Sequence, residues 1–203
     1  MTFETVSPLR KRDSHLWDRD PHDWYCEPPW TAERLFDVQP FAGEIVDPAC
    51  GRGNIVSAAK AAHHCAEGWD IVDRGYLGTK VRNFLAWEQP VCNIVSNPPF
   101  GIAEIFVKHA LKIARYQVCM LLPATWVQGD KRSRWLEQTS LTKVLFITPR
   151  PSMPPGAAIM AGQPPGNGTT DYAWFCWGQG YKGPAAVGWL RRDYKSFDEW
   201  TVS

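Results

Sequence analysis

The stretch NIVSNPPFG, residues 93–101, places a polar amide at the end of an apolar run. Because proline cannot donate to a sheet ladder, the strand predicted here ends near Asn97. The Asn97 side-chain oxygen and the Pro98 carbonyl can each accept a hydrogen bond from an exocyclic amine and orient its lone pair toward a methyl donor. Pro98 and Pro99 stiffen the turn, and Phe100 can stack on an aromatic base. A base inside a duplex would have to flip out to reach this turn.

A second polar loop, VDPACGRGN, follows an earlier apolar run. Asp47 ends that run, Gly51 and Gly53 permit close backbone approach, and a helix is predicted to begin directly afterwards. This arrangement suits a nucleoside-bearing ligand with a polar or charged tail. The G-x-G spacing is equally compatible with a tight turn, and it matches neither the longer dinucleotide pattern nor a P-loop. The loop by itself therefore leaves cofactor binding open.

Two more polar residues follow strand-like segments. Asp70 lies about 20 residues beyond the glycine loop, where an acid can bind ribose hydroxyls. Asp73 competes for that role, and either acid could be a solvated loop residue. Asn83 lies where a third, weaker strand would end, and its amide could bind an adenine edge or form a turn.

The segments that must position these residues alternate between strand and helix patterns through residue 140. Strands are predicted within 43–47, 66–75, 81–87, 91–96, 117–123, 143–149 and 172–177, and helices within 31–36, 54–65 and 102–116. Such alternation predicts an α/β protein with a parallel sheet and helices on both faces. Ligands of these sheets bind beyond the carboxyl ends of the strands, where both polar loops are expected. The Pro/Gly-rich segment 149–170 is long for a compact domain, which indicates a binding loop or disorder.

The composition fits one globular domain without repeats or linkers. The chain has 203 residues, of which 44% are hydrophobic and 21% charged. A formal net charge of +1 excludes a uniformly basic nucleic-acid coat. Residues 131–195 nevertheless carry nine Lys or Arg against three acids, which suits a phosphate backbone or, equally well, a solvated surface.

The six cysteines show no metal-binding pattern. They include no C-x-x-C pair and no Cys/His grouping at zinc spacing, so no metal is expected. Reduced cysteines, the absence of a signal-peptide apolar core at the N-terminus and the absence of an 18-residue apolar run predict a cytoplasmic protein with no membrane partner. Cys50 lies beside the glycine loop. Cytosine C5 methylation uses a Pro-Cys step in the target loop, which Asn-Pro-Pro-Phe lacks, so Cys50 is expected to be a lining residue.

The order DPACGRG, GWDIV, RNFL and SNPPF resembles S-adenosylmethionine-dependent amino methyltransferases. Within them the sequence is most similar to DNA N6-adenine methyltransferases of the small phage and prophage type. The resemblance implies a Rossmann-like class I methyltransferase sheet, mostly parallel with helices on both faces and an antiparallel edge near the C-terminus. It also implies a single domain over residues 1–203 with no separate target-recognition domain. The expected activity is methyl transfer from S-adenosylmethionine to adenine N6 in DNA, inside a bacterial or phage-infected cell.

The resemblance assigns roles to individual residues. The target base would be held by Asn97, Pro98, Pro99 and Phe100. The cofactor would be bound by residues of the upstream segment, the glycine loop and the next two strand ends: Tyr25, Pro28, Asp47, Ala49, Cys50, Gly51, Gly53, Asp70 and Asn83. DNA would be contacted from the loops 129–134 and 150–168 through Lys131, Arg132, Arg134 and Arg150.

Two positions depart from the family pattern. Glu27 stands where the family commonly has Thr, and an acid there is unfavourable near the cofactor carboxylate unless it meets the amino group. Its role stays open. Asn83 replaces the commoner Asp but can still accept from an adenine amine.

Other functions share parts of this pattern. The same tetrad serves methylation of RNA bases and of protein glutamine, because each substrate presents a planar amine or amide. A non-catalytic S-adenosylmethionine-binding module would keep the fold without the chemistry, although the intact Asn97 tetrad disfavours it. A nicotinamide oxidoreductase would explain the first loop but not the tetrad.

Overall fold

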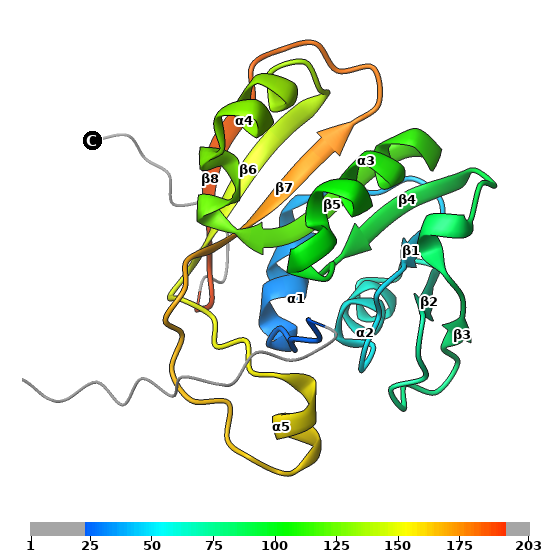
Figure 1. The fold of residues 1–203 in the computed structure, drawn as a ribbon, viewed down its shortest axis with the longest axis vertical. Helices are drawn as coiled ribbons and strands as arrows, with labels where there is room; N and C mark the ends of the chain where they lie inside the picture. Colours follow the sequence, from blue (N-terminus) through cyan, green and yellow to red (C-terminus); the bar gives the residue numbers. More distant parts are fainter. Residues whose placement is uncertain (1–22, 194–203) are drawn as a thin grey trace, which may run out of the picture.

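The computed structural model describes residues 23–193, which build one eight-stranded sheet with helices on both faces (Figure 1). Its strands are β1 (Ile45–Asp47), β2 (Ala66–Asp70), β3 (Lys80–Val81), β4 (Val91–Ser96), β5 (Ala114–Pro123), β6 (Leu141–Thr148), β7 (Tyr172–Gly178) and β8 (Ala186–Arg191). They are ordered β3-β2-β1-β4-β5-β7-β6-β8. All pairings are parallel except those of β7, which runs antiparallel to β5 and β6. The predicted mostly parallel sheet with antiparallel pairing near the C-terminus is confirmed. The pattern did not predict β8, which forms the outer strand beyond β6.

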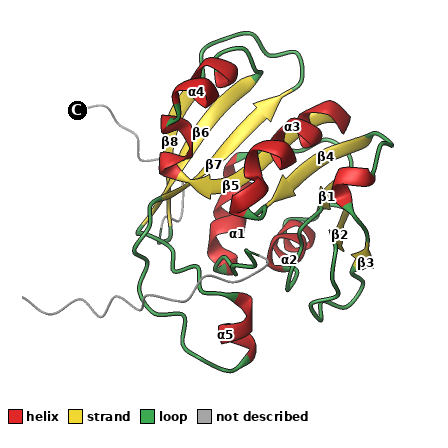
Figure 2. Ribbon diagram, in the orientation of Figure 1, coloured by secondary structure: helices red, strands yellow, loops and turns green. Residues whose placement is uncertain are grey.

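Most helices lie in two layers, one on each face of the sheet, and α5 lies apart from both (Figure 2). The α-helices are α1 (Pro29–Val38), α2 (Asn54–Ala61), α3 (Ala103–Ile113), α4 (Asp130–Leu136) and α5 (Gly156–Met160), and the 3-10 helices are η1 (Phe84–Ala86), η2 (Phe100–Ile102) and η3 (Ala124–Gln128). Helices α1 and α2 share a hydrophobic core with one face of the sheet. Helices α3 and α4, with η3, share a core with the opposite face. This confirms the expectation of helices on both faces.

Alternation along the central strands divides the buried residues between the two cores. On β4, Ile94 packs in the core of α3, whereas Val95 packs in the core of α1 and α2. On β5, Met120 and Leu121 divide in the same way. All four side chains are fully buried, and each contributes roughly 1.5–3 kcal/mol of transfer free energy. This packing holds the carboxyl end of β4, and therefore Asn97, in a rigid frame.

Three local expectations differ from the structure. The third strand is only Lys80–Val81, because the Asn83 side chain accepts from the Leu85 N–H at 3.1 Å and starts η1. The long helix after the tetrad ends at Ile113, since Ala114 begins the pairing of β5 with β4. The predicted loop 129–134 is mostly helical, because α4 begins at residue 130.

The Pro/Gly-rich segment 149–170 is ordered by pairing with the segment before α1. The N–H of Cys26 donates to the Pro154 carbonyl at 2.9 Å, and the N–H of Gly156 donates to the Trp24 carbonyl at 2.8 Å. The segment also contains α5. The segment therefore holds residues 24–26 in place.

Two predictions reach beyond the described residues. The N-terminal segment in which no signal-peptide pattern is expected lies outside them, and the single domain predicted over residues 1–203 is described over 23–193 only. Within that range, none of the helices has the length and apolar character required to cross a bilayer.

Candidate active site

A cavity of about 290 Å³ lies at the carboxyl ends of β1, β2 and β4. Its lining comes from within five segments of the chain, 23–27, 48–54, 70–74, 82–85 and 97–106. The structure thus brings the glycine loop, the ends of the next strands and the tetrad together at one edge of the sheet. Of the predicted site residues, the cavity is lined by Tyr25, Ala49, Cys50, Gly51, Asp70, Asn83, Asn97 and Pro99.

The other predicted residues lie behind or beside this lining. Pro28 precedes α1 as its N-cap residue, and Gly53 does the same for α2 with φ of +77°. Asp47 is buried below the glycine loop, and Pro98 is buried within the tetrad. Phe100 stacks on Tyr25, with ring centroids 5.8 Å apart and an interplanar angle of 10°.

Asn97 is held in one orientation at the end of β4. Its Nδ2 donates to the Tyr25 carbonyl and to Glu27 Oε2, both at 2.8 Å. If the amide were flipped, its oxygen would face two hydrogen-bond acceptors. These partners therefore identify the nitrogen and the oxygen of the Asn97 amide. The Asn97 Oδ1 is buried and has no hydrogen-bond partner within residues 23–193. A buried acceptor without a donor costs about 1–3 kcal/mol, and Asn97 also lines the cavity.

Three carboxylates are buried around the cavity. Glu27 is 8% exposed, Asp47 1% and Asp70 4%. Burial raises the pKa of Glu27 to about 7, opposed by hydrogen bonds from its own backbone and from Asn97. Burial, followed by the charge of Glu27, raises the pKa of Asp47 well above its ordinary value, although Ser96 Oγ donates to Oδ1 at 2.8 Å. Such a group of acids favours a cationic ligand.

Asp70 ties the glycine loop to the end of β2. Its Oδ2 accepts from the Gly51 N–H at 3.0 Å, its Oδ1 accepts from the Val72 N–H at 3.1 Å, and the Arg74 Nε lies 3.4 Å from Oδ1. Asp73 is exposed and instead accepts from the Gly75 N–H at 2.9 Å. Of the two competing acids, Asp70 is the one that lines the cavity.

The thiol of Cys50 faces the same site. Burial, with a smaller effect of the Asp47 charge, raises the pKa of Cys50 to about 12. A thiol that stays protonated at neutral pH is a poor nucleophile. Its position in the cavity wall agrees with the predicted lining role.

Several lining residues have no clear signal in the sequence. Trp24 packs between two glycines: a Cβ at Gly51 would lie 2.8 Å from the indole Nε1, and one at Gly156 would lie 2.2 Å from the ring. The Arg74 guanidinium lies 4.4 Å from the Trp24 ring centroid. Arg82 lies over both Trp69 and Trp87, at 4.9 and 4.6 Å. The adjacency of Trp24 to Tyr25 and of Arg82 to Asn83 is the only pattern that points to them.

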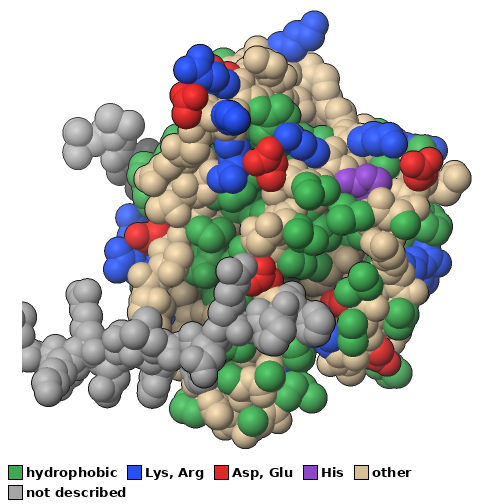
Figure 3. Space-filling view, viewed as in Figure 1, with side chains coloured by type: hydrophobic (Ala, Val, Ile, Leu, Met, Phe, Trp, Pro, Cys, Tyr) green, Lys and Arg blue, Asp and Glu red, His purple; other side chains and the backbone are tan. Residues whose placement is uncertain are grey.

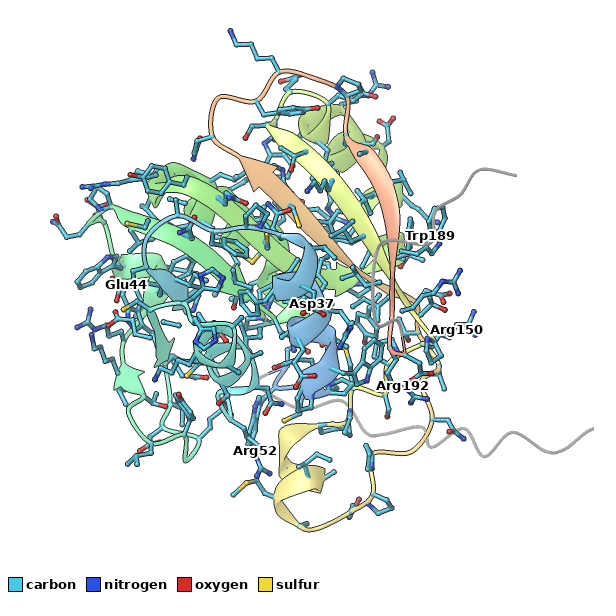
Figure 4. The ribbon with its side chains drawn as sticks, turned by 180° about the vertical axis from the view of Figure 1, so that it is seen from behind. Asp37, Glu44, Arg52, Arg150, Trp189 and Arg192 are labelled. Carbon is cyan, nitrogen blue, oxygen red and sulfur yellow. The ribbon has the colours of Figure 1, made fainter. Side chains whose placement is uncertain are left out.

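The four residues predicted to contact DNA lie outside the cavity lining. Arg134 pairs with Asp130 at 3.2 Å, and Arg150 pairs with Asp171 at 2.6 Å. Arg132 lies 3.3 Å from Glu104 with its guanidinium over Trp126, while Lys131 is exposed. Figure 3 shows Lys and Arg side chains near α4 with acidic side chains among them. In Figure 4, Arg150 lies across the molecule from Arg52, which lines the cavity.

No group of three His, Cys, Asp or Glu residues within the described part of the chain is arranged to hold a metal ion. No family model matches the sequence, and neither does any curated protein.

Solved structures do match the fold. A candidate RNA methyltransferase from Pyrococcus horikoshii superposes with a TM-score of 0.52 at 15% identity, over 74% of this chain and 81% of that one. A candidate class I S-adenosylmethionine-dependent methyltransferase from Listeria monocytogenes gives 0.54 at 12% identity, over 79% of this chain and 62% of that one. Geranyl diphosphate C-methyltransferase from Streptomyces coelicolor gives a TM-score of 0.51 at 15% identity, over 73% of this chain and 78% of that one. The chain therefore has the Rossmann-like class I methyltransferase fold. The neighbours act on unlike substrates, so the particular reaction must be argued from the site.

Proposed function

We propose that this protein transfers a methyl group from S-adenosylmethionine to the N6 amine of adenine in DNA. The observation that carries the proposal is the buried, unpartnered Asn97 Oδ1 at the cavity, with its amide held by Glu27 and Tyr25. An exocyclic amine is the donor that this acceptor lacks. The order of motifs around Asn97 adds the resemblance to adenine methyltransferases.

The residues of the cavity fit the proposed cofactor. When bound, S-adenosylmethionine supplies an electrophilic methyl group on a cationic sulfur. The buried acids Glu27, Asp47 and Asp70 favour that positive charge. Asp70 lies where it can accept from ribose hydroxyls, and Gly51 permits close approach of the ligand's methionine end.

The tetrad would position the acceptor amine. Asn97 Oδ1 and the Pro98 carbonyl accept the two N6 hydrogens and turn the nitrogen lone pair toward the methyl carbon. The nitrogen forms a bond to that carbon as the carbon–sulfur bond breaks and leaves its electron pair on sulfur. The additional N6 proton then passes to solvent, so no strong general base is required.

An aromatic stack lies beside this amide and suits a flipped base. Phe100 stacks on Tyr25 with ring centroids 5.8 Å apart, and the Tyr172 ring lies tilted by 34° at the same centroid separation from Phe100. Stacking on such rings contributes about 1–3 kcal/mol per base. We expect the target base to enter at this stack, where Phe100 supports its ring and Asn97 binds its amine.

The test is transfer of labelled methyl from S-adenosylmethionine to unmethylated DNA, with RNA and total protein as parallel substrates, followed by digestion and identification of the product. N6-methyladenine in DNA alone is the expected result. Label in RNA alone, or on protein glutamine, would assign the same site to another planar acceptor. Cofactor binding without transfer to any substrate would indicate a non-catalytic module.

A further inference from the structure

We infer that Glu27 is a positioning residue that turns the Asn97 oxygen toward the target amine and, as a carboxylate, strengthens it as a hydrogen-bond acceptor. The inference rests on the proposed function and explains the acid that departs from the family pattern. Glu27 and Asn97 are 70 residues apart in the chain and meet at 2.8 Å. Glu27 is 8% exposed, so the contact lies away from solvent.

The backbone around Glu27 keeps its carboxylate at this place. Asn54 Nδ2 donates to the Glu27 carbonyl at 2.8 Å, which ties it to the start of α2. On the following residues, Thr31 Oγ1 donates to the Pro28 carbonyl at 2.8 Å within the first turn of α1. The carboxylate is therefore supported by two helices.

An anionic partner changes what the Asn97 amide can do. A carboxylate that accepts from Nδ2 draws electron density toward the amide oxygen, and charge-assisted bonds are roughly twice as strong as neutral ones. In a buried site these bonds polarise one another further. The Tyr25 carbonyl accepts from the same nitrogen and contributes orientation without charge. The Glu27 carboxylate thus gives the Asn97 amide oxygen part of the acceptor strength that a carboxylate oxygen would have.

The charge of Glu27 should vary near neutral pH, since burial raises its pKa to about 7. Below that value it is protonated and neutral, and above it the carboxylate is present. The rate of transfer should therefore rise between about pH 6 and 8. The titratable or charged residues that share its surroundings are Asp23, Tyr25, Cys26, Asp47, Cys50, Arg52, Asp70, Arg74 and Arg82. Asp47 has a pKa raised well above its ordinary value and adds less repulsion than its position suggests.

The experiment compares the full-length wild type with Glu27→Gln, which keeps shape and removes charge. Glu33→Gln is the matched control on an exposed position of α1. Single-turnover transfer to unmethylated DNA is measured at saturating S-adenosylmethionine from pH 6 to 8.5, and binding of S-adenosylhomocysteine is measured by calorimetry. We expect Glu27→Gln to transfer about tenfold more slowly at pH 8, less than the loss from removing a direct contact, with a flat pH profile. Glu33→Gln should match the wild type.

A second readout does not depend on activity. The Asn97 side-chain NH₂ resonances, assigned by their loss in Asn97→Ala, should shift with pH around 7 in the wild type and not in Glu27→Gln. Should the wild type methylate nothing, the proposed function fails while this titration still decides whether Glu27 holds Asn97. An unshifted resonance overturns the inference. The inference is also overturned if Glu27→Gln binds the cofactor weakly but transfers at the wild-type rate when saturated with it. Glu27 would then bind the amino group of the cofactor.

Discussion

At the scale of single residues, the site is organised around one amide. Asn97 Nδ2 has two hydrogen-bond acceptors, whereas the buried Asn97 Oδ1 has no donor within residues 23–193, which is costly. Such an atom persists where a ligand completes it. The buried acids Glu27 and Asp47 are also costly, because burial destabilises their charged forms in the absence of a cation.

Asn97→Ala should lower single-turnover methyl transfer by about 100- to 1,000-fold, the loss seen when one aimed hydrogen-bonding group is removed. Binding of S-adenosylhomocysteine, measured by calorimetry, should change by less than about threefold because the amide faces the acceptor amine. Gln89→Ala, at an exposed position outside the cavity lining, is the control and should behave as the wild type. Full activity in Asn97→Ala would rule out the mechanism proposed for the tetrad.

Asp47→Asn should stabilise the protein increasingly as pH rises. The pKa of Asp47 in the folded state lies above its unfolded value, so the folded form binds more protons. Wild-type stability therefore falls as pH rises from about 4 toward that raised pKa, and the neutral amide avoids this loss. Urea unfolding should show the advantage of Asp47→Asn to be larger at pH 8 than at pH 5. A smaller advantage at pH 8 would contradict the assignment.

At the scale of elements, a distant segment braces the cavity wall. Tyr25 forms an isolated bridge with Pro155, and Trp24 fills the space between the glycine loop and the start of α5. The loop and α5 can approach Trp24 only because both contact residues lack a side chain. Segment 149–170 therefore supports the cavity wall from behind, although none of its residues lines the cavity.

Gly51→Ala should weaken S-adenosylhomocysteine binding by tenfold or more. Gly51 has φ of +51°, and its new Cβ would lie 2.8 Å from Trp24 Nε1, so loop or indole must move. Gly180→Ala has a comparable φ of +79° and nothing within 4 Å, so it carries the backbone strain alone, about 1–2 kcal/mol. Equal loss of binding in both variants would show that strain, and not the fit against Trp24, sets the effect.

At the scale of the whole molecule, three of the four residues predicted to contact DNA already have acidic partners. Arg132, Arg134 and Arg150 are engaged by Glu104, Asp130 and Asp171. A phosphate must compete with these acids, whereas Lys131 is an exposed residue of the first turn of α4. Their role in DNA binding stays a prediction.

Lys131→Ala should lower the slope of log affinity against log salt for DNA by about 0.9, the value for one released counterion. Arg134→Ala should lower it less, since Arg134 exchanges Asp130 for the phosphate. Fluorescence anisotropy between 50 and 200 mM salt measures both slopes. Identical slopes for Lys131→Ala and the wild type would remove Lys131 from the interface.

The sequence alone determined the features that depend on neighbouring residues. Proline ends β4 at the tetrad, the glycines shape the first loop, and the alternation of apolar runs predicts the α/β class. It also singled out Asp70 and Asn97, because residues after parallel strands share one edge of the sheet.

Only the tertiary structure decided contacts across long separations. The pairing of Glu27 with Asn97, the ring contacts of Phe100 with Tyr25 and Tyr172, and the packing of Trp24 against Gly156 join segments 70 residues or more apart. Strand order and register determine these contacts, and no local sequence pattern encodes them. At Asn83 and at residues 130–136 local propensity allowed several outcomes, and the structure shows a cap at the first and a helix at the second.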